Sequence, residues 1–472
     1  MSAKIRDYTQ GSVTGNLVAM AGPMMFGFMA QTLYDLVDMA WVGRLSAGAV
    51  AAVTIFATIY WLSSFMNNLV GNSSVSLISQ AFGAQDHERT ALVVEQTLVF
   101  KALLAVVSSA IILPLLPRLL GLFSNDPHVL SEALAYGRVR LLMLPIMFSK
   151  LTVATAMRCV GDSKRAMQLM FFSAGLNALL DPLFIFERIP GLGWSGLGLG
   201  VMGAALATEI SAALSLLLGA WMLFSGKTAV KPSLSGLLRL DYEIDWQLIK
   251  IGLPTSIESA LRSLAEVFTL RFISVYGTVA LAAMGIATRL AQFFFVPLNG
   301  LMAGGSAIVG QNLGAAKVER AEQTAKAASG LGVGCMAVLA VLTVSFPRQI
   351  FGLFTADPGV IALGRSVIYA LLPMLLIAGF YLGLATALAG AGYNLPFLIS
   401  GVVSRWGVQL PFLFIAVKWL KLPFIYAAIS FPVSELAGGA VIVVAFLQGR
   451  WRTWRVHKQQ SSQAAVGKAA GA

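Results

Sequence analysis

A carboxylate stands inside the first long apolar stretch of this chain. Asp38 lies within residues 20–42, a segment otherwise dominated by Met, Phe, Leu, Ala and Val. An ionisable side chain at membrane depth costs roughly 2.5–3.5 kcal/mol on insertion scales, so it is retained mainly where it faces a cavity and has a function. We therefore expect Asp38 to take part in ion-coupled transport.

A second polar pair interrupts a later apolar stretch. Asn177 and Asp181 are four residues apart, so on a helix they share one face and can point into one pocket. Asp38 and Asp181 each lie about six residues before the outer ends of their predicted helices, about 9 Å at 1.5 Å per residue. Two carboxylates brought together without water cannot both stay ionised cheaply, and a proton or a sodium ion relieves the repulsion. Both ions stay open at this point, because carboxylate and amide oxygens suit either.

Three further residues of the first stretch are predicted to support Asp38. Asp35 is three positions away and can share its face, and Gln31 and Tyr34 are candidates to line the same cavity. Pro23 lacks an amide donor and is expected to free the Ala19 carbonyl. Pro182 is expected to free the Ala178 carbonyl in the same way. A helix kinked at Pro23 could pack in two ways, and protonation of Asp38 would shift the equilibrium between them.

The composition predicts an all-α membrane protein. The chain has 472 residues, of which 57% are apolar and 11% charged, and it divides into long apolar stretches joined by short polar ones. At roughly 20 residues per spanning helix, these stretches predict twelve transmembrane helices. Little of the chain is left for a soluble domain.

The formal charge of +12 is concentrated in alternate loops. This distribution indicates a positive-inside bias rather than a nucleic-acid partner, and it places both termini in the cytoplasm of a cell bounded by an inner or plasma membrane. The basic tail, residues 450–472, is expected to lie on anionic lipid. Cys159 and Cys335 stand far apart and predict neither a disulfide nor a metal site.

The chain repeats itself at an offset of 231 residues. Pro23 aligns with Pro254, and the segment Gln80-Ala81-Phe82-Gly83-Ala84 aligns with Gln311-Asn312-Leu313-Gly314-Ala315. Six helices per repeat give two pseudo-symmetric lobes of the same orientation, which commonly rock about a central cavity. The predicted division is residues 1–224 for the first lobe, 225–246 for a solvated linker, 247–449 for the second lobe and 450–472 for the tail.

Taken together, these residues resemble the multidrug and toxic compound extrusion (MATE) family. The likeness lies in Pro23 and Asp38, in the repeated Gln-x-x-Gly-Ala segment, in Asn177-x-x-x-Asp181-Pro182 and in the segment from Gly203 to Thr208. The chain is most similar to the DinF-like branch. The resemblance implies a cation or proton site in the first lobe formed by Asp38, Asn177, Asp181 and Thr208.

The same resemblance implies an antiporter of organic cationic or amphipathic compounds, working as a monomer among membrane lipids. It implies no cofactor other than the coupling ion, H⁺ or Na⁺. In the NorM-like branch a functional glutamate of the seventh helix stands where this chain places Arg262. The offset also puts Thr269 opposite Asp38, so coupling is expected in the first lobe alone.

Charged residues recur at a spacing of four in the seventh predicted helix. Glu258, Arg262 and Glu266 share one face, and Arg289 of the next helix is a candidate member of the same network, with Arg405 and Glu435 as further ones. One interpretation is a buried ion network without a transport role. The other is part of a substrate or proton path in the second lobe.

Two other classes of function were compared with the antiporter. In a lipid-linked or anionic-amphiphile flippase of related fold, Arg262, Arg289 and Arg405 would bind an anionic headgroup. A membrane enzyme would need a nucleophile or metal set. The three histidines lie in loops or the tail, and neither an HExxH nor a GxSxG motif is present, so no enzyme is expected.

Overall fold

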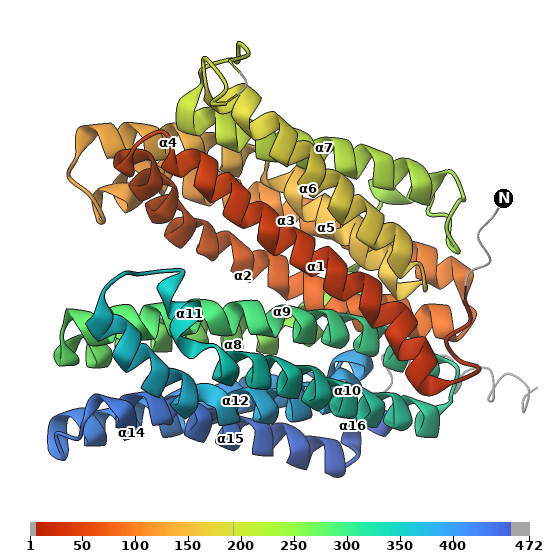
Figure 1. Cartoon of the computed structure of the whole chain (residues 1–472). Helices are drawn as coiled ribbons and strands as arrows, with labels where there is room; N and C mark the ends of the chain where they lie inside the picture. Colours follow the sequence, from red (N-terminus) through yellow and green to blue (C-terminus); the bar gives the residue numbers. More distant parts are fainter. Residues whose placement is uncertain (1–5, 192, 455–472) are drawn as a thin grey trace, which may run out of the picture.

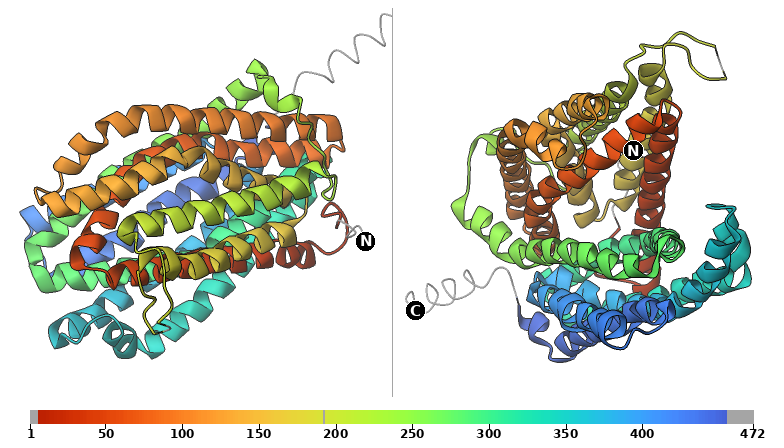
Figure 2. Two further views of the ribbon diagram at one scale, coloured as in Figure 1. Left: turned by 90° about the horizontal axis from the view of Figure 1, so that it is seen from above. Right: turned by 90° about the vertical axis from the view of Figure 1, so that its left-hand side faces the viewer.

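The protein is a bundle of long helices arranged as two lobes. The computed structural model describes residues 6–191 and 193–454, so most of the predicted tail lies outside the described residues. In Figure 1 the first half of the chain lies above the second half, and the end view in Figure 2 separates the same two groups of helices. Within the described residues the only β-pairing is one isolated bridge between Arg188 and Ser195. The predicted all-α fold is confirmed.

The first lobe contains seven helices. They are α1 (Val13–Gly43), α2 (Ala47–Gly83), α3 (His87–Gly121), α4 (Pro127–Leu142), α5 (Leu144–Cys159), α6 (Ser163–Ile185) and α7 (Gly200–Phe224). The pair α4 and α5 is bent by 50° at Met143 and acts as one broken span. The lobe therefore crosses the bilayer six times when that pair is counted once.

The second lobe repeats this order with more interruptions. Its long helices are α8 (Tyr242–Ile273), α9 (Thr278–Gly314), α10 (Val318–Ser345), α12 (Pro358–Ala391) and α15 (Phe424–Leu447). One further span, Leu395–Trp419, combines α13 (Leu395–Gly401), a π-helix at Val402–Gln409, α14 (Leu410–Phe414) and a π-helix at Ile415–Trp419. Short helical segments complete the described chain: the 3₁₀ turns Gly236–Leu238 and Ser274–Tyr276, α11 (Pro347–Gly352) and α16 (Arg450–Thr453).

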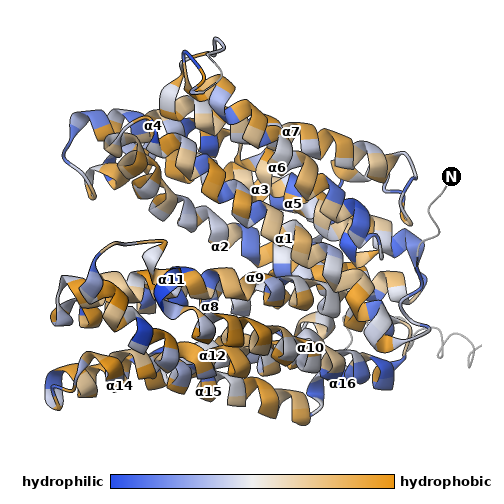
Figure 3. Ribbon diagram, viewed as in Figure 1, coloured by the Kyte–Doolittle hydropathy of each residue, from blue (hydrophilic) through white to orange (hydrophobic). Residues whose placement is uncertain are grey.

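Ten of the described helices are long and apolar enough to cross a membrane, and the bent α4/α5 pair makes an eleventh span. Figure 3 shows apolar residues along these helices in both lobes. The predicted total of twelve is reached by including α8, which is 32 residues long and packs against α2 and α13. Its charged residues at 258, 262 and 266 lower the hydropathy of this helix.

The linker between the lobes is shorter than predicted, because α8 begins at Tyr242. The Asp241 carboxylate accepts hydrogen bonds from the amides of Glu243 and Ile244, at 3.0 and 3.1 Å, and so caps the helix. Glu243 and Asp245 add negative charge to the first turn, where it interacts favourably with the helix dipole. The connecting segment is therefore residues 225–241.

The lobes meet along a seam that follows the repeat. Helix α1 packs against α9, and their repeat mates α8 and α2 pack against each other. Small residues let these backbones approach: a Cβ at Gly83 would overlap the Gln311 carbonyl, and a Cβ at Gly314 would overlap the Gln80 carbonyl. Close packing of this kind associates helices in a bilayer, where lipid tails are as apolar as the side chains.

Two repeat-related glutamines bond across this seam. Gln80 donates to the carbonyls of Gly390 and Ala391 at 3.0 and 3.1 Å, and Gln311 donates to the carbonyl of Cys159 at 2.7 Å. Cys159 and Gly390 are themselves 231 positions apart. The repeated Gln-x-x-Gly-Ala segment thus forms a symmetric pair of contacts, which we call the glutamine clamp.

The clamp lies at the end of the bundle that carries the N-terminus, and other contacts close the same end. Lys317 donates to the Thr9 carbonyl at 2.9 Å, Arg320 donates to the Gln10 carbonyl at 2.7 Å, and Asn72 donates to Thr255 at 3.3 Å. In residues 6–191 and 193–454, every hydrogen bond found between the lobes lies in this half of the bundle. Among the described residues, the hydrogen bonds between the lobes are therefore confined to one end of the bundle.

Candidate ion-coupling site

Three of the four predicted site residues contact one another inside the first lobe. Asn177 of α6 donates to Asp181 Oδ1 at 2.9 Å and lies 3.3 Å from Thr208 Oγ1 of α7. The predicted four-residue spacing on one helix face produces the first contact. Exposed fractions are 0% for Asp181, 1% for Asn177 and 6% for Thr208, so the group is removed from solvent.

Asp38 of α1 completes the set. Its carboxyl group and that of Asp181 lie close enough to share a hydrogen bond. Two carboxyl groups can make that bond only when one of them carries a proton, because an ionised carboxylate is an acceptor only. The contact joins α1 to α6, two helices separated by more than a hundred residues of chain.

Several buried oxygens of this group have no hydrogen-bond donor among the residues that the structure describes. These atoms are Asp38 Oδ1, Asn177 Oδ1 and Asp181 Oδ2. Buried polar atoms without partners are costly, and such a cluster calls for an explanation such as a proton or an ion. Two carboxylates, an amide oxygen and a hydroxyl are hard oxygen ligands that fit a small cation or a proton.

Of the predicted supporting residues on α1, one contacts this group and two lie beside it. The Tyr34 hydroxyl contacts Thr208 Oγ1 at 3.2 Å, so it borders the site directly. Gln31 donates to Asp35 Oδ1 at 3.2 Å, and Asp35 is exposed. Tyr34 therefore belongs to the site, whereas Asp35 and Gln31 form a neighbouring pair on α1.

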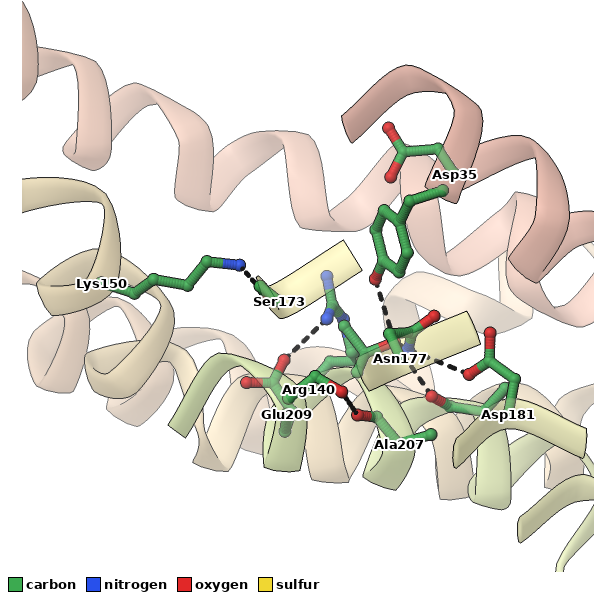
Figure 4. A network of polar contacts seen from close by, with 12 residues as sticks. Asp35, Arg140, Lys150, Ser173, Asn177, Asp181, Ala207 and Glu209 are labelled. Atoms are coloured by element: carbon green, nitrogen blue, oxygen red, sulfur yellow. Dashed lines mark hydrogen bonds and ion pairs between the residues drawn. The ribbon is translucent and has the colours of Figure 1, made fainter. Parts of the chain in front are cut away.

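A second group of charges beside the site was not predicted from the sequence. Arg140 of α4 and Glu209 of α7 form an ion pair at 2.7 Å, with exposed side-chain fractions of 11% and 4%. Lys150 of α5 donates to Ser173 of α6 at 2.8 Å. Figure 4 shows these contacts beside Asn177 and Asp181. The signal for Glu209 was available, since this acid follows Thr208 in an apolar helix.

Pro23 frees a carbonyl as predicted from the sequence, but the carbonyl finds a partner in the protein. Helix α1 continues through Pro23 from Val13 to Gly43. The Ser163 hydroxyl at the start of α6 donates to the Ala19 carbonyl at 3.4 Å. This carbonyl therefore links α1 to α6 instead of facing a cavity.

Comparisons with known proteins identify the family of the chain. The sequence pattern of the family described as MatE matches residues 23–183 and 254–415, one segment in each lobe. The chain belongs to the MatE family. It is 29% identical over 438 residues to the probable multidrug resistance protein YoeA of Bacillus subtilis, covering 91% of this chain and 92% of that protein. It is 24% identical over 434 residues to the multidrug export protein MepA of Staphylococcus aureus, with coverage of 91% and 92%.

A solved structure is similar over nearly the whole length. An outward-facing multidrug resistance MATE transporter of the MOP superfamily aligns with a TM-score of 0.87 and 26% identity, covering 97% of this chain and 100% of that chain. This chain is therefore a multi-pass membrane protein with the two-lobed MATE fold. As a member of this family it is a transporter and not an enzyme.

In the second lobe of this MATE transporter, the predicted stripe of alternating charge is present on α8. Arg262 lies 3.3 Å from Glu258 Oε1 and 3.9 Å from Glu266 Oε1. The side chains of Arg262 and Glu266 are 41% and 61% exposed. Arg289 is exposed and has no hydrogen bond or ion pair with the described residues, so its membership of the network stays a prediction.

A more enclosed network joins α12, α15 and the π-helical span. Arg405 contacts Glu435 at 3.0 Å and donates to Gln409 at 2.8 Å, and Tyr381 donates to the other oxygen of Glu435 at 2.7 Å. Arg405 stands in the π-helix Val402–Gln409, a widened geometry that often marks functional positions. In this network of the MATE transporter the two charged side chains, Arg405 and Glu435, thus neutralise each other.

Proposed function

We propose that this chain is a cation-coupled MATE antiporter that exports organic compounds, with the coupling site in the first lobe. The observation that carries the proposal is the set of buried oxygens without donors on Asp38, Asn177 and Asp181. A proton or a cation would satisfy these atoms, and both can be supplied and withdrawn by an ion gradient. The relatives named for multidrug resistance and export support the substrate side of the proposal.

The residues of the site can bind either ion. For a proton, the close pair Asp38 and Asp181 would share it, since one proton removes the repulsion between two carboxylates. For sodium, the two carboxylates, the Asn177 amide oxygen and the Thr208 hydroxyl would be ligands. In either case the ion would hold α1 against α6 and α7, because its ligands come from all three helices.

Export requires that ion binding and lobe movement affect each other. The lobes are joined at the end that carries the N-terminus and the glutamine clamp, in keeping with the similar outward-facing structure. In the proposed orientation this basic end faces the cytoplasm across an inner or plasma membrane, with both termini on that side. Entry of an ion from the outside would change the packing of α1 and favour release of the substrate.

The proposed substrates are small organic cations or amphipathic compounds, taken from the membrane or the cytoplasm by a monomer. Acidic residues near the site, Asp35 above all, offer counter-charge to a cation. The ion pair of Arg140 with Glu209 leaves this part of the lobe with balanced charge. Relatives named for multidrug export fit a site that tolerates several compounds.

The flippase alternative receives no support from the arginines on which it depended. Arg262 is paired with Glu258 and Glu266, and Arg405 with Glu435. Binding an anionic headgroup there would require breaking these pairs. Arg289 alone is exposed without a partner among the described residues, and one arginine does not make a headgroup site.

The test is dye efflux from proteoliposomes in which a pH gradient and a sodium gradient are imposed separately. The proposal predicts that one gradient drives efflux and that Asp38→Asn or Asp181→Asn abolishes the response to it. The matched control is Glu266→Gln, an exposed acid of the second lobe, which should respond as the unaltered protein does. Full gradient response in both first-lobe variants would refute the coupling proposal.

A further inference from the structure

The segment between the lobes, residues 225–241, is fastened to the first lobe. We call it the linker strap. Glu95 of α3 accepts a hydrogen bond from the Ser233 amide, and Gln96 donates to the Arg239 carbonyl at 2.8 Å and accepts from the Asp241 amide at 2.9 Å. Glu95 and Gln96 are 4% and 0% exposed. The strap therefore holds a defined position against α3.

The strap turns leucines outward. Leu234, Leu238 and Leu240 are 70%, 89% and 60% exposed, while Val230 of the same segment is 3% exposed and belongs to the core of the lobe. A loop solvated by water would leave these leucines in contact with water over most of their surface. Three outward leucines on a fastened segment indicate a surface that is covered by other apolar material, such as lipid or protein.

The strap also lies at the level of an aromatic belt. Trp221 near the end of α7 and Trp246 near the start of α8 flank it, both 53% exposed, with Tyr242 at 80%. Tryptophan and tyrosine concentrate where headgroups meet acyl chains. Figure 2 shows the strap in the end view, running along the outside of the bundle from the first lobe to the second.

The exposed charges of the strap are basic. Lys227, Lys231 and Arg239 are exposed, and the Lys227 amine lies 3.4 Å from the centre of the Trp221 ring. The acids that follow are engaged elsewhere: Asp241 caps α8, and Asp245 is buried. Glu243 is exposed and accepts from Gln247 at 3.2 Å. Basic residues beside apolar ones suit an anionic lipid surface.

We propose that the linker strap lies in the headgroup region of the leaflet at the basic end, with its leucines among the acyl chains and Lys231 and Arg239 against anionic headgroups. This replaces the solvated connector expected from the sequence. It does not depend on which ion the transporter uses. Because the strap is bonded to α3 and leads into α8, lipid bound there touches the connection between two moving lobes.

The test places a nitroxide spin label on the full-length protein in vesicles. A background with Cys159→Ala and Cys335→Ala receives Leu238→Cys or Leu234→Cys. Two reference sites calibrate depth: Leu217→Cys on α7, which is 65% exposed in a spanning helix, and Glu88→Cys, which is exposed at the start of α3. Collision with oxygen reports lipid, and collision with a water-soluble nickel chelate reports water. Each labelled protein must retain its thermal unfolding temperature.

The proposal predicts oxygen-to-nickel collision ratios at Leu234 and Leu238 close to that at Leu217 and several-fold above that at Glu88. Ratios equal to that at Glu88 would overturn it in favour of a solvated connector. Low collision with both reagents would also overturn it, because it would mean that protein, such as a second copy of this chain, covers the strap.

The anionic part is tested with phosphatidylcholine vesicles with and without phosphatidylglycerol. Adding the anionic lipid should raise the oxygen-to-nickel ratio at Leu238, and Lys231→Gln with Arg239→Gln should remove that increase. The matched control is Lys326→Gln, an exposed lysine on α10 outside the strap, which should preserve the increase. The headgroup assignment would be overturned if the ratio still increased in the double variant. It would also be overturned if the anionic lipid did not raise the ratio in the unaltered strap.

Discussion

The two lobes share a scaffold but place their charges differently. In the first lobe, Asp38 and Asp181 lie together with buried oxygens that lack donors. In the second, Thr269 stands at the position that the repeat pairs with Asp38, and Leu371 at the position paired with Arg140. The enclosed charges of the second lobe that resemble a network, Arg405 and Glu435, are paired with each other, and Arg262 is paired with Glu258. The repeat thus preserves the seam between the lobes, while the site with unsatisfied oxygens belongs to one lobe.

The largest expected contrast concerns the removal of one arginine from each lobe. Arg140→Leu would leave Glu209 buried without its partner, and breaking a buried pair costs about 3–5 kcal/mol of unfolding free energy. Arg262→Leu breaks a half-exposed pair, where about 0–1 kcal/mol is expected. Thermal unfolding in detergent measures both. Equal losses of unfolding free energy in the two variants would contradict the contrast in burial. The double variant Arg140→Leu with Glu209→Leu should recover part of the stability lost in Arg140→Leu.

A smaller effect is expected within the enclosed network of the second lobe. Tyr381→Phe removes the hydroxyl that donates to Glu435, and a hydrogen bond to a charged group contributes about 1.5–3 kcal/mol. The unfolding temperature should fall, while the ratio of ion flux to substrate flux should stay unchanged. A change in that ratio would show that the second lobe takes part in coupling. Tyr369→Phe, which alters an exposed tyrosine of the same helix, is the control.

The glutamine clamp should respond alike in both lobes. Gln80→Leu and Gln311→Leu each remove hydrogen bonds across the seam, each of which contributes about 0.5–1.5 kcal/mol. Both variants should shift the protein toward opening at the basic end, by up to about tenfold in population for each hydrogen bond lost. Spin labels at the repeat-related exposed positions Glu88 and Glu319 measure the separation of the lobes there. If only one of the two variants changed this separation, the result would contradict equivalent roles for the two glutamines.

The smallest expected effect comes from a hydroxyl of the site. Thr208→Val keeps the side-chain volume but removes the oxygen that contacts Tyr34 and Asn177. If this oxygen is a ligand of the coupling ion, the ion concentration for half-maximal efflux should rise several-fold with little loss of stability. Thr269→Val in the second lobe is the matched control and should leave that concentration unchanged. Similar shifts in both variants would remove Thr208 from the site.

The sequence was sufficient for the features that depend on spacing. The offset of 231 predicted the two lobes, and the spacing of Asn177 and Asp181 predicted their contact. The α8 stripe followed from a spacing of four in the same way. Each of these inferences uses residues on one helix or a regular period of the chain, for which geometry is known in advance.

Contacts between distant helices could not be derived in this way. Arg140 and Glu209 are 69 residues apart, and Lys150 and Ser173 are 23 apart, so their pairing depends on how helices pack. The alignment revealed that Gln80 and Gln311 correspond, but not that each bonds the opposite lobe. The exposed leucines of the linker strap were hidden for a similar reason: their orientation depends on the anchoring of Ser233, Arg239 and Asp241 to α3.

The most direct test of a coupling site confined to the first lobe separates coupled from uncoupled transport in the same proteoliposomes. Substrate counterflow needs the moving lobes but no ion gradient, whereas uphill efflux needs both. For Asp38→Asn and Asp181→Asn we predict that counterflow continues and gradient-driven efflux is lost, while Glu258→Gln retains both. Gradient-driven efflux that survives in Asp38→Asn and Asp181→Asn but fails in Glu258→Gln would contradict the account and place coupling in the second lobe.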